Sequence, residues 1–172
     1  MSLAIAERHA SSARSPIGHR KLAPVTTCNN REGSMALEWR EQLSVGNDLI
    51  DADHKYLIEI INLAEQGLKR HDRVVLMGAL DNLERYSKMH FSREEAIATA
   101  AGYPKAEHLH LSHEALVTAL TKVKEEIGEA WEASAVEHFS AFLRTWLIDH
   151  VIKEDLLMKP FLKKLSPRFD PR

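Results

Sequence analysis

Apolar side chains recur at alternating steps of four and three residues along four separate stretches of the sequence. This spacing keeps them on one face of an α-helix, so each stretch predicts a long amphipathic helix. The first two stretches carry Ile50, His54, Leu57, Ile61, Ala64 and Leu68, then Leu76, Leu80, Leu83, Ser87, His90, Glu94, Ile97 and Ala101. The last two carry Ala106, Leu109, His113, Leu116, Leu120, Val123 and Ile127, then Val136, Phe139, Leu143, Trp146 and His150.

Four such helices with short connections predict an all-α fold, an antiparallel up-down four-helix bundle. Gly102 is placed to end the second helix, and Asp48 or Asp51 can cap the start of the first. A short C-terminal helix is expected after Asp155, with Pro160 inside or kinking it.

Residues 1–34 differ from the rest of the chain. They are rich in Ser, Arg, Pro and Asn and carry no sustained apolar period. We expect a flexible N-terminal extension here and a single bundle domain over residues 35–172. A transit peptide is one alternative for this segment, and translation from Met35 is another.

Composition narrows the class of protein and its partners. A chain of 172 residues that is 44% hydrophobic can bury one good core. Its formal net charge of -2 gives no field that would attract nucleic acid or a membrane surface. No apolar run approaches the roughly 20 residues that a membrane-spanning helix needs. The single cysteine, Cys28, fits a reducing compartment, so we expect a cytoplasmic protein.

Each predicted helix carries a histidine on its apolar face. These histidines are His54, His90, His113 and His150. A buried polar group without a partner costs about 1–3 kcal/mol in proteins, so each of them needs a hydrogen-bond partner or a metal. Glu94 lies one turn after His90 and shares its face. Asp155 lies five residues after His150 and can turn inward only if the helix breaks between them.

Histidine and carboxylate together are suitable ligands for iron, and also for zinc, copper, nickel or manganese. Four histidines and two carboxylates exceed what one tetrahedral zinc ion takes. Two metal ions bridged by the carboxylates are therefore expected in the core of the bundle.

Several segments also resemble a known family. In order, they are Trp39, SVGNDLIDADHKYL, HFSREE, GYPKAEHLHLSHEAL and WLIDHVIKED. Taken together they resemble the bacterial hemerythrins over residues 36 to 165. The resemblance implies a four-helix bundle that holds two non-haem iron ions (Fe2+/Fe3+), oxo- or hydroxo-bridged, and binds O2 reversibly.

The resemblance also implies a ligand set. Glu94 and Asp155 would bridge the two irons, and His54 and His90 would hold the iron that binds O2. The other iron would take His113, His150 and a further histidine from the third helix.

The third helix departs from the family pattern at this further histidine. The family would place it at position 109, four residues before His113, but this chain has Leu109 there. His110 is the residue we assign to complete the set, because three-residue spacing still shares a helix face. His108 would need a distorted helix. The remaining alternative has no third histidine, with water or Glu107 in its place.

The function expected from these residues is reversible O2 binding at a non-haem di-iron centre, for storage, delivery or sensing, and not enzymatic catalysis. Because of Leu109, a hemerythrin-like protein that reduces peroxide or nitric oxide is an alternative. A di-iron oxidase of ferritin type needs two Glu-x-x-His motifs, and only Glu107 to His110 matches here. An iron-storage or iron-sensing role would require exchangeable metal.

Overall fold

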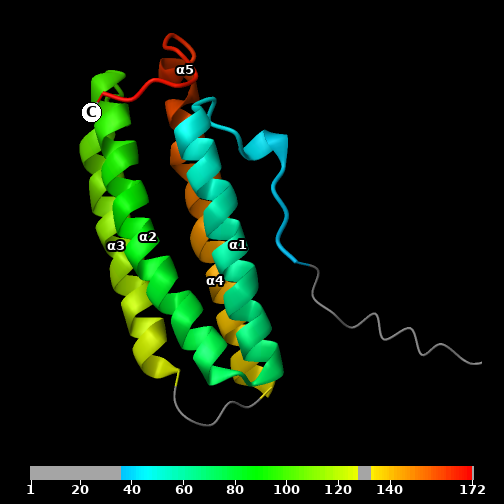
Figure 1. Ribbon diagram of the computed structural model, residues 1–172. Helices are drawn as coiled ribbons and strands as arrows, with labels where there is room; N and C mark the ends of the chain where they lie inside the picture. The colour runs from blue at the N-terminus through cyan, green and yellow to red at the C-terminus, as the bar shows by residue number, and fades with distance from the viewer. Residues whose placement is uncertain (1–35, 128–132, 172) are drawn as a thin grey trace, which may run out of the picture. The chain divides into compact units, whose positions relative to one another are not determined.

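The computed structural model describes residues 36–127 and 133–171. Four long helices run antiparallel through these residues (Figure 1): α1 (Asp48–Arg70), α2 (Arg73–Ala100), α3 (Ala106–Glu126) and α4 (Ala133–Lys153). Short turns of helix flank them: η1 (Glu41–Leu43) before α1, then η2 (Asp155–Met158) and α5 (Lys159–Leu162) after α4. The four-helix bundle and the short C-terminal helix are thereby confirmed. The expected N-terminal extension, with Cys28, lies outside the described residues.

The residue that caps α1 differs from both residues predicted from the sequence. The side chain of Asn47, not that of Asp48 or Asp51, accepts hydrogen bonds from the first free backbone N–H groups of α1, at 3.0 and 3.2 Å. Asp48 is already inside the helix. Asp51 instead accepts hydrogen bonds from the Ser44 hydroxyl at 2.6 Å and the Val45 backbone N–H at 2.9 Å. The Asp51 carboxylate therefore holds the segment before α1 against the helix by two hydrogen bonds.

Only two residues connect α1 to α2, and the helices approach closely there. His71 ends α1 in the left-handed conformation, with φ 54°, and Asp72 caps α2. Gly67 faces the start of α2 so closely that a Cβ at this position would lie 2.7 Å from the backbone nitrogen of Leu76. Glycine is required for this contact, and the contact fixes how α1 and α2 are placed along each other.

The predicted apolar faces form the core. In α1 every position of the predicted seam is at most 1% exposed. A large apolar cluster fills most of the bundle from all four long helices. A smaller cluster closes the end where α1 and α3 begin and α2 and α4 end (Figure 1). Its buried members are Val45, Ile50, Ile97, Ala98, Tyr103, Leu109, Met158 and Leu162.

The C-terminal segment is tied to this same end of the bundle. The backbone N–H of Asp48 donates to the Pro167 carbonyl at 2.7 Å, and the Asn47 side chain donates to the Phe169 carbonyl at 3.0 Å. The ammonium of Lys159 donates to the Ser44 carbonyl at 2.6 Å. Among the helices that the structure describes, none has the length and hydropathy to cross a membrane.

Candidate metal centre

Side chains of the types that bind metals come together from the four long helices and η2, at one level between the two apolar clusters. We call this group of side chains the layer. They are His54 of α1, His90 and Glu94 of α2, His113 of α3, His150 of α4 and Asp155 of η2. Each of these residues is at most 6% exposed. α4 ends at Lys153 and Asp155 opens the 3-10 turn η2. This is the helix break that the five-residue spacing from His150 required.

Each carboxylate lies between one histidine of α1 or α2 and one of α3 or α4. Asp155 has its oxygens 3.4 Å from Nε2 of His54 and 3.0 Å from Nε2 of His150. Glu94 has Oε2 3.7 Å from Nε2 of His90 and 3.3 Å from Nε2 of His113. In two groups, all ligand atoms lie within 4.8 Å of one another: Glu94, His113, His150 and Asp155 form one, and His54, His90 and Glu94 the other. The layer therefore consists of two histidine pairs joined by shared carboxylates.

Many polar atoms of this layer lack a hydrogen-bond partner in the protein. Both oxygens of Glu94 and of Asp155, both ring nitrogens of His54 and Nε2 of His90 are buried without a hydrogen bond. Leaving such groups unsatisfied costs about 1–3 kcal/mol each, more for charged groups, and cations coordinated by these atoms would remove that cost. Imidazole nitrogen and carboxylate oxygen are a donor set that suits iron and other divalent transition metals. The residues thus fit a pair of metal ions.

The electrostatics of the layer also favour a cation. Burial, together with the neighbouring Asp155 carboxylate, raises the pKa of Glu94 to about 8. Burial alone would raise the pKa of Asp155 as well, but the imidazoles of His150 and His54 outweigh it and hold that pKa well below its ordinary range. A buried pair of carboxyl groups therefore favours a nearby cation, and metal ions would supply that charge.

Asp53 supports His90 from behind. Its carboxylate accepts from Nδ1 of His90 at 3.3 Å, from the Tyr86 hydroxyl at 2.7 Å and from Arg93 at 2.6 and 2.7 Å. Burial acts to raise the pKa of Asp53, but these bonds and charges lower it overall, so the carboxylate stays ionised. Burial also lowers the pKa of His90 to about 4, which keeps its ring neutral and able to ligate. With Nδ1 held by Asp53, Nε2 is directed into the layer.

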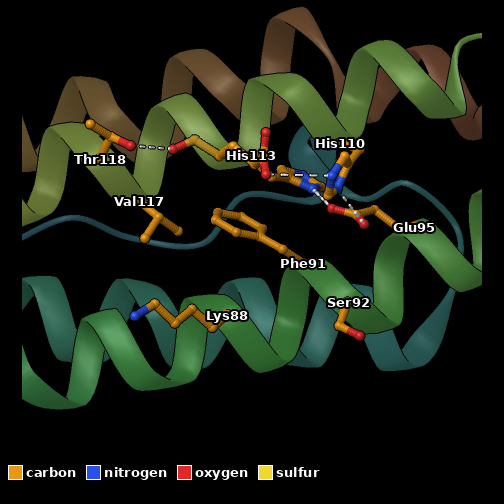
Figure 2. Close-up of a pocket in the computed structure, with 9 residues that line it drawn as sticks. Lys88, Phe91, Ser92, Glu95, His110, His113, Val117 and Thr118 are labelled. Atoms are coloured by element: carbon orange, nitrogen blue, oxygen red, sulfur yellow. Dashed lines mark hydrogen bonds and ion pairs between the residues drawn. The ribbon is translucent and has the colours of Figure 1, made fainter.

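Glu95 supports His113 in the same manner on the opposite side. Its carboxylate accepts from Nδ1 of His113 at 2.7 Å and from Nδ1 of His110 at 3.0 Å. Figure 2 shows Glu95 reaching from α2 to both histidines of α3, at one end of a surface groove of about 510 Å³. Burial lowers the pKa of His113, and the hydrogen bond to Glu95 opposes that shift. Nε2 of His113 is thus directed into the layer, where it lies 2.9 Å from Nε2 of His150.

Of the seven ligands predicted from the sequence, only His110 is not brought to the layer. Its side chain is 52% exposed and is bonded to Glu95. His108, the other histidine considered, is 62% exposed and faces Glu154 at 3.5 Å. Leu109 lies between them, is 1% exposed and packs in the smaller apolar cluster. α3 remains a regular helix, so its register keeps 108 and 110 outside.

Apolar side chains close the layer along the bundle axis. Toward the end with α5, an apolar residue follows or precedes a candidate ligand by about one turn on α1, α2, α3 and η2: Ile50, Ile97, Leu109 and Met158. On the other side the ring of Phe91 stacks on that of His113, with centroids 4.0 Å apart and planes 7° apart. Trp39 covers His54 with its ring centroid at 6.5 Å. The ligand atoms are therefore screened from water.

Sequence reasoning left the supporting residues undecided. It assigned none of Asp53, Glu95 and Arg93 to the orientation of a ligand histidine. The position of Arg93, three residues after His90, is a usable signal, because both side chains then lie on neighbouring parts of α2.

A four-helix bundle with this buried layer of histidines and shared carboxylates defines a class, the metal-binding helical-bundle proteins. The family model of the hemerythrin HHE cation binding domain matches residues 45–162. The chain belongs to this family.

Relatives and solved structures agree with this assignment. The chain is 25% identical over 123 residues to a bacteriohemerythrin of Clostridium acetobutylicum, covering 68% of this chain and 94% of that protein. It is 29% identical over 112 residues to a bacteriohemerythrin of Methylococcus capsulatus, covering 65% and 85%. A crystal structure of a leucine-to-tyrosine mutant of hemerythrin superposes with a TM-score of 0.65 at 26% identity, covering 74% of this chain and 98% of the other.

Proposed function

We propose that this protein binds O2 reversibly at a non-haem di-iron centre, in storage, delivery or sensing of oxygen. His54 and His90 hold one iron, and His113 and His150 hold the other. Glu94 and Asp155 are shared between them. His110 is not part of this ligand set.

One observation carries the proposal: each of the two carboxylates has a histidine from either half of the layer within 3.7 Å. A single metal ion would not use histidines on both sides of both carboxylates. Two ions would use all six residues, and would satisfy the buried atoms that otherwise lack partners.

The protein's part in O2 binding is to hold ligands and exclude water. Two irons held by these residues would supply the electrons that reversible O2 binding needs, so no side chain has to be oxidised. Asp53 and Glu95 fix the orientation of His90 and His113. The apolar layers on both sides keep water and protons from the site, which protects bound oxygen from loss as a reduced product.

The proposal is tested by loading the purified protein with ferrous iron without oxygen, followed by metal analysis and visible spectroscopy. We expect two irons per chain, absorption bands of coupled ferric ions on exposure to O2, and loss of those bands when O2 is removed. His54→Ala should lose iron and the bands. His138→Ala, at an exposed position of α4, is the matched control and should lose neither.

Two results would contradict the proposal. One is a content of a single metal ion, or of zinc, in the wild-type protein. The other is rapid oxidation by O2 that removing O2 does not reverse.

Reduction of peroxide or nitric oxide is the second candidate function. Leu109 favours it, because a leucine supplies no ligand atom beside His113 and leaves that iron open to a substrate. Iron-loaded protein given an electron donor and hydrogen peroxide would then consume many equivalents per iron pair. Consumption that stops at one equivalent argues for oxygen binding alone.

A further inference from the structure

Each half of the candidate metal site offers two histidines and the shared Glu94, and Asp155 lies between His54 and His150. His54 and His90 stand on one side of the shared carboxylates, and His113 and His150 stand on the other. Two histidines and two shared carboxylates are fewer donors than an octahedral ion takes. Non-haem iron with two histidines and carboxylate keeps open positions for small molecules.

No other described residue completes the second half. Leu109 is one turn before His113 on the same face of α3, so it occupies the place from which a further ligand of that helix would reach the layer. It is buried and carries no donor atom. The neighbouring histidines interact with carboxylates outside the layer. His108 faces Glu154, and His110 is hydrogen-bonded to Glu95.

The second half also lies nearer the surface than the first. His113 lines the groove of about 510 Å³ between α2 and α3, where Figure 2 shows its ring beside Glu95 and Phe91. His150 lines a second groove, of about 280 Å³, between α3 and α4. Both of its histidines therefore border a surface groove, although their side chains are only 2% and 3% exposed.

We propose that both iron positions of this protein, and not one alone, bind a small external ligand. The ligands are anions or neutral molecules of two or three atoms, because the apolar residues Ile50, Leu109 and Met158 pack against the layer on one side. A ferric ion that shares two carboxylates with its neighbour retains positive charge, so small anions bind in preference. This inference rests on the proposed di-iron centre.

Azide binding to the iron-loaded protein tests the inference. Calorimetry and visible absorbance should give two azides per pair of irons in the wild type. Leu109→His places an imidazole on the face of His113 and should reduce the number to one. Leu109→Ile adds no donor, keeps the volume and should still give two, which makes it the matched control.

Iron release to a chelator gives a second readout. The wild type should lose one iron of each pair faster than the other, and Leu109→His should slow that faster phase at least tenfold. Circular dichroism shows whether the variant folds. If Leu109→His does not fold, the number of azides bound by the wild type decides whether the inference holds.

The outcomes separate this inference from the proposed function. Fewer than two irons per chain would overturn both. Two irons with a single azide in the wild type would overturn only the inference, and so would an azide number that Leu109→His leaves at two.

Discussion

The two halves of the candidate metal site offer the same types of side chain but are supported very differently. Behind His90, Asp53 is 3% exposed and bonds Tyr86 and Arg93 as well. Behind His113, the side chain of Glu95 is 25% exposed, and its other partner, His110, is itself 52% exposed. One support is a buried network, and the other borders a groove (Figure 2).

This difference shows that equal ligand sets need not give equal metal sites. Histidines fixed by a buried, ionised carboxylate lose little freedom when they bind a metal. Histidines fixed from a solvent-facing carboxylate are held less firmly, because water competes for each hydrogen bond. We therefore expect the half formed by α1 and α2 to be the more rigid one.

The largest expected effect comes from breaking the buried support. Asp53→Asn removes the charge that pairs with Arg93 and orients His90, so iron affinity should fall about 10–100-fold. Loss of charged hydrogen bonds of about 2 kcal/mol should lower the melting temperature by about 4–8 °C. Chelator competition and thermal unfolding measure the two effects. Asp149→Asn, on the exposed face of α4, is the control, and an equal effect there would contradict the prediction.

The carboxylate common to both halves predicts a pH effect in the metal-free protein. The pKa of Glu94 is raised from 4.5 to about 8, so the folded state binds more protons than the unfolded state between these values. The contribution of Glu94 to the free energy of unfolding is fully present below pH 4.5 and is lost as the pH rises to about 8. Glu94→Gln removes the titration. The melting temperature of this variant should therefore gain several degrees on the wild type between pH 5 and 8. A constant difference across that range would refute the assignment.

A smaller effect is expected from the exposed support. Glu95→Gln keeps a hydrogen-bond acceptor for Nδ1 of His113 but removes the charge, and solvent already screens that charge. Iron affinity should fall by less than about tenfold, with the melting temperature nearly unchanged. If this variant weakens iron binding as much as Asp53→Asn, the two halves are equally supported and the comparison fails.

The smallest expected effect is that of His110→Ala. Its ring bonds Glu95 from the solvent side and supplies no atom to the layer. Iron content should stay at two per chain, and the visible spectrum should not change. A loss of one iron would restore His110 to the ligand set that the sequence had suggested.

The helical spacing of apolar residues in the sequence predicted most of the elements that position the candidate site. The four seams and five of the six residues of the layer follow from steps of four and three residues, because a helix fixes the direction of each side chain. Asp155 lies five residues after His150 and reaches the layer only because the helix breaks between them. The same rule placed Leu109 in the core, but it also allowed His110, three residues before His113, as a ligand, and the structure leaves His110 outside the layer.

The supports could not be predicted in the same way. Asp53 meets Tyr86 and Arg93, and Glu95 meets His113, across helix boundaries. Such contacts depend on how two helices are placed along each other, which spacing within one helix does not specify. The cap of α1 shows a similar limit, because Asn47 and Asp51 are both suitable and only the path of the preceding segment decides between them.

The close approach of α1 and α2 at Gly67 links a position far from the candidate metal site to the spacing of two of its ligands. Gly67 is thirteen residues from His54 along α1, about 20 Å by helical rise. A methyl group there would meet the backbone of Leu76 and would have to push α1 away from α2. Because these helices carry His54 and His90, a change at the far end of the hairpin would alter the spacing of two ligands. Metal content would therefore report on a substitution that touches no ligand.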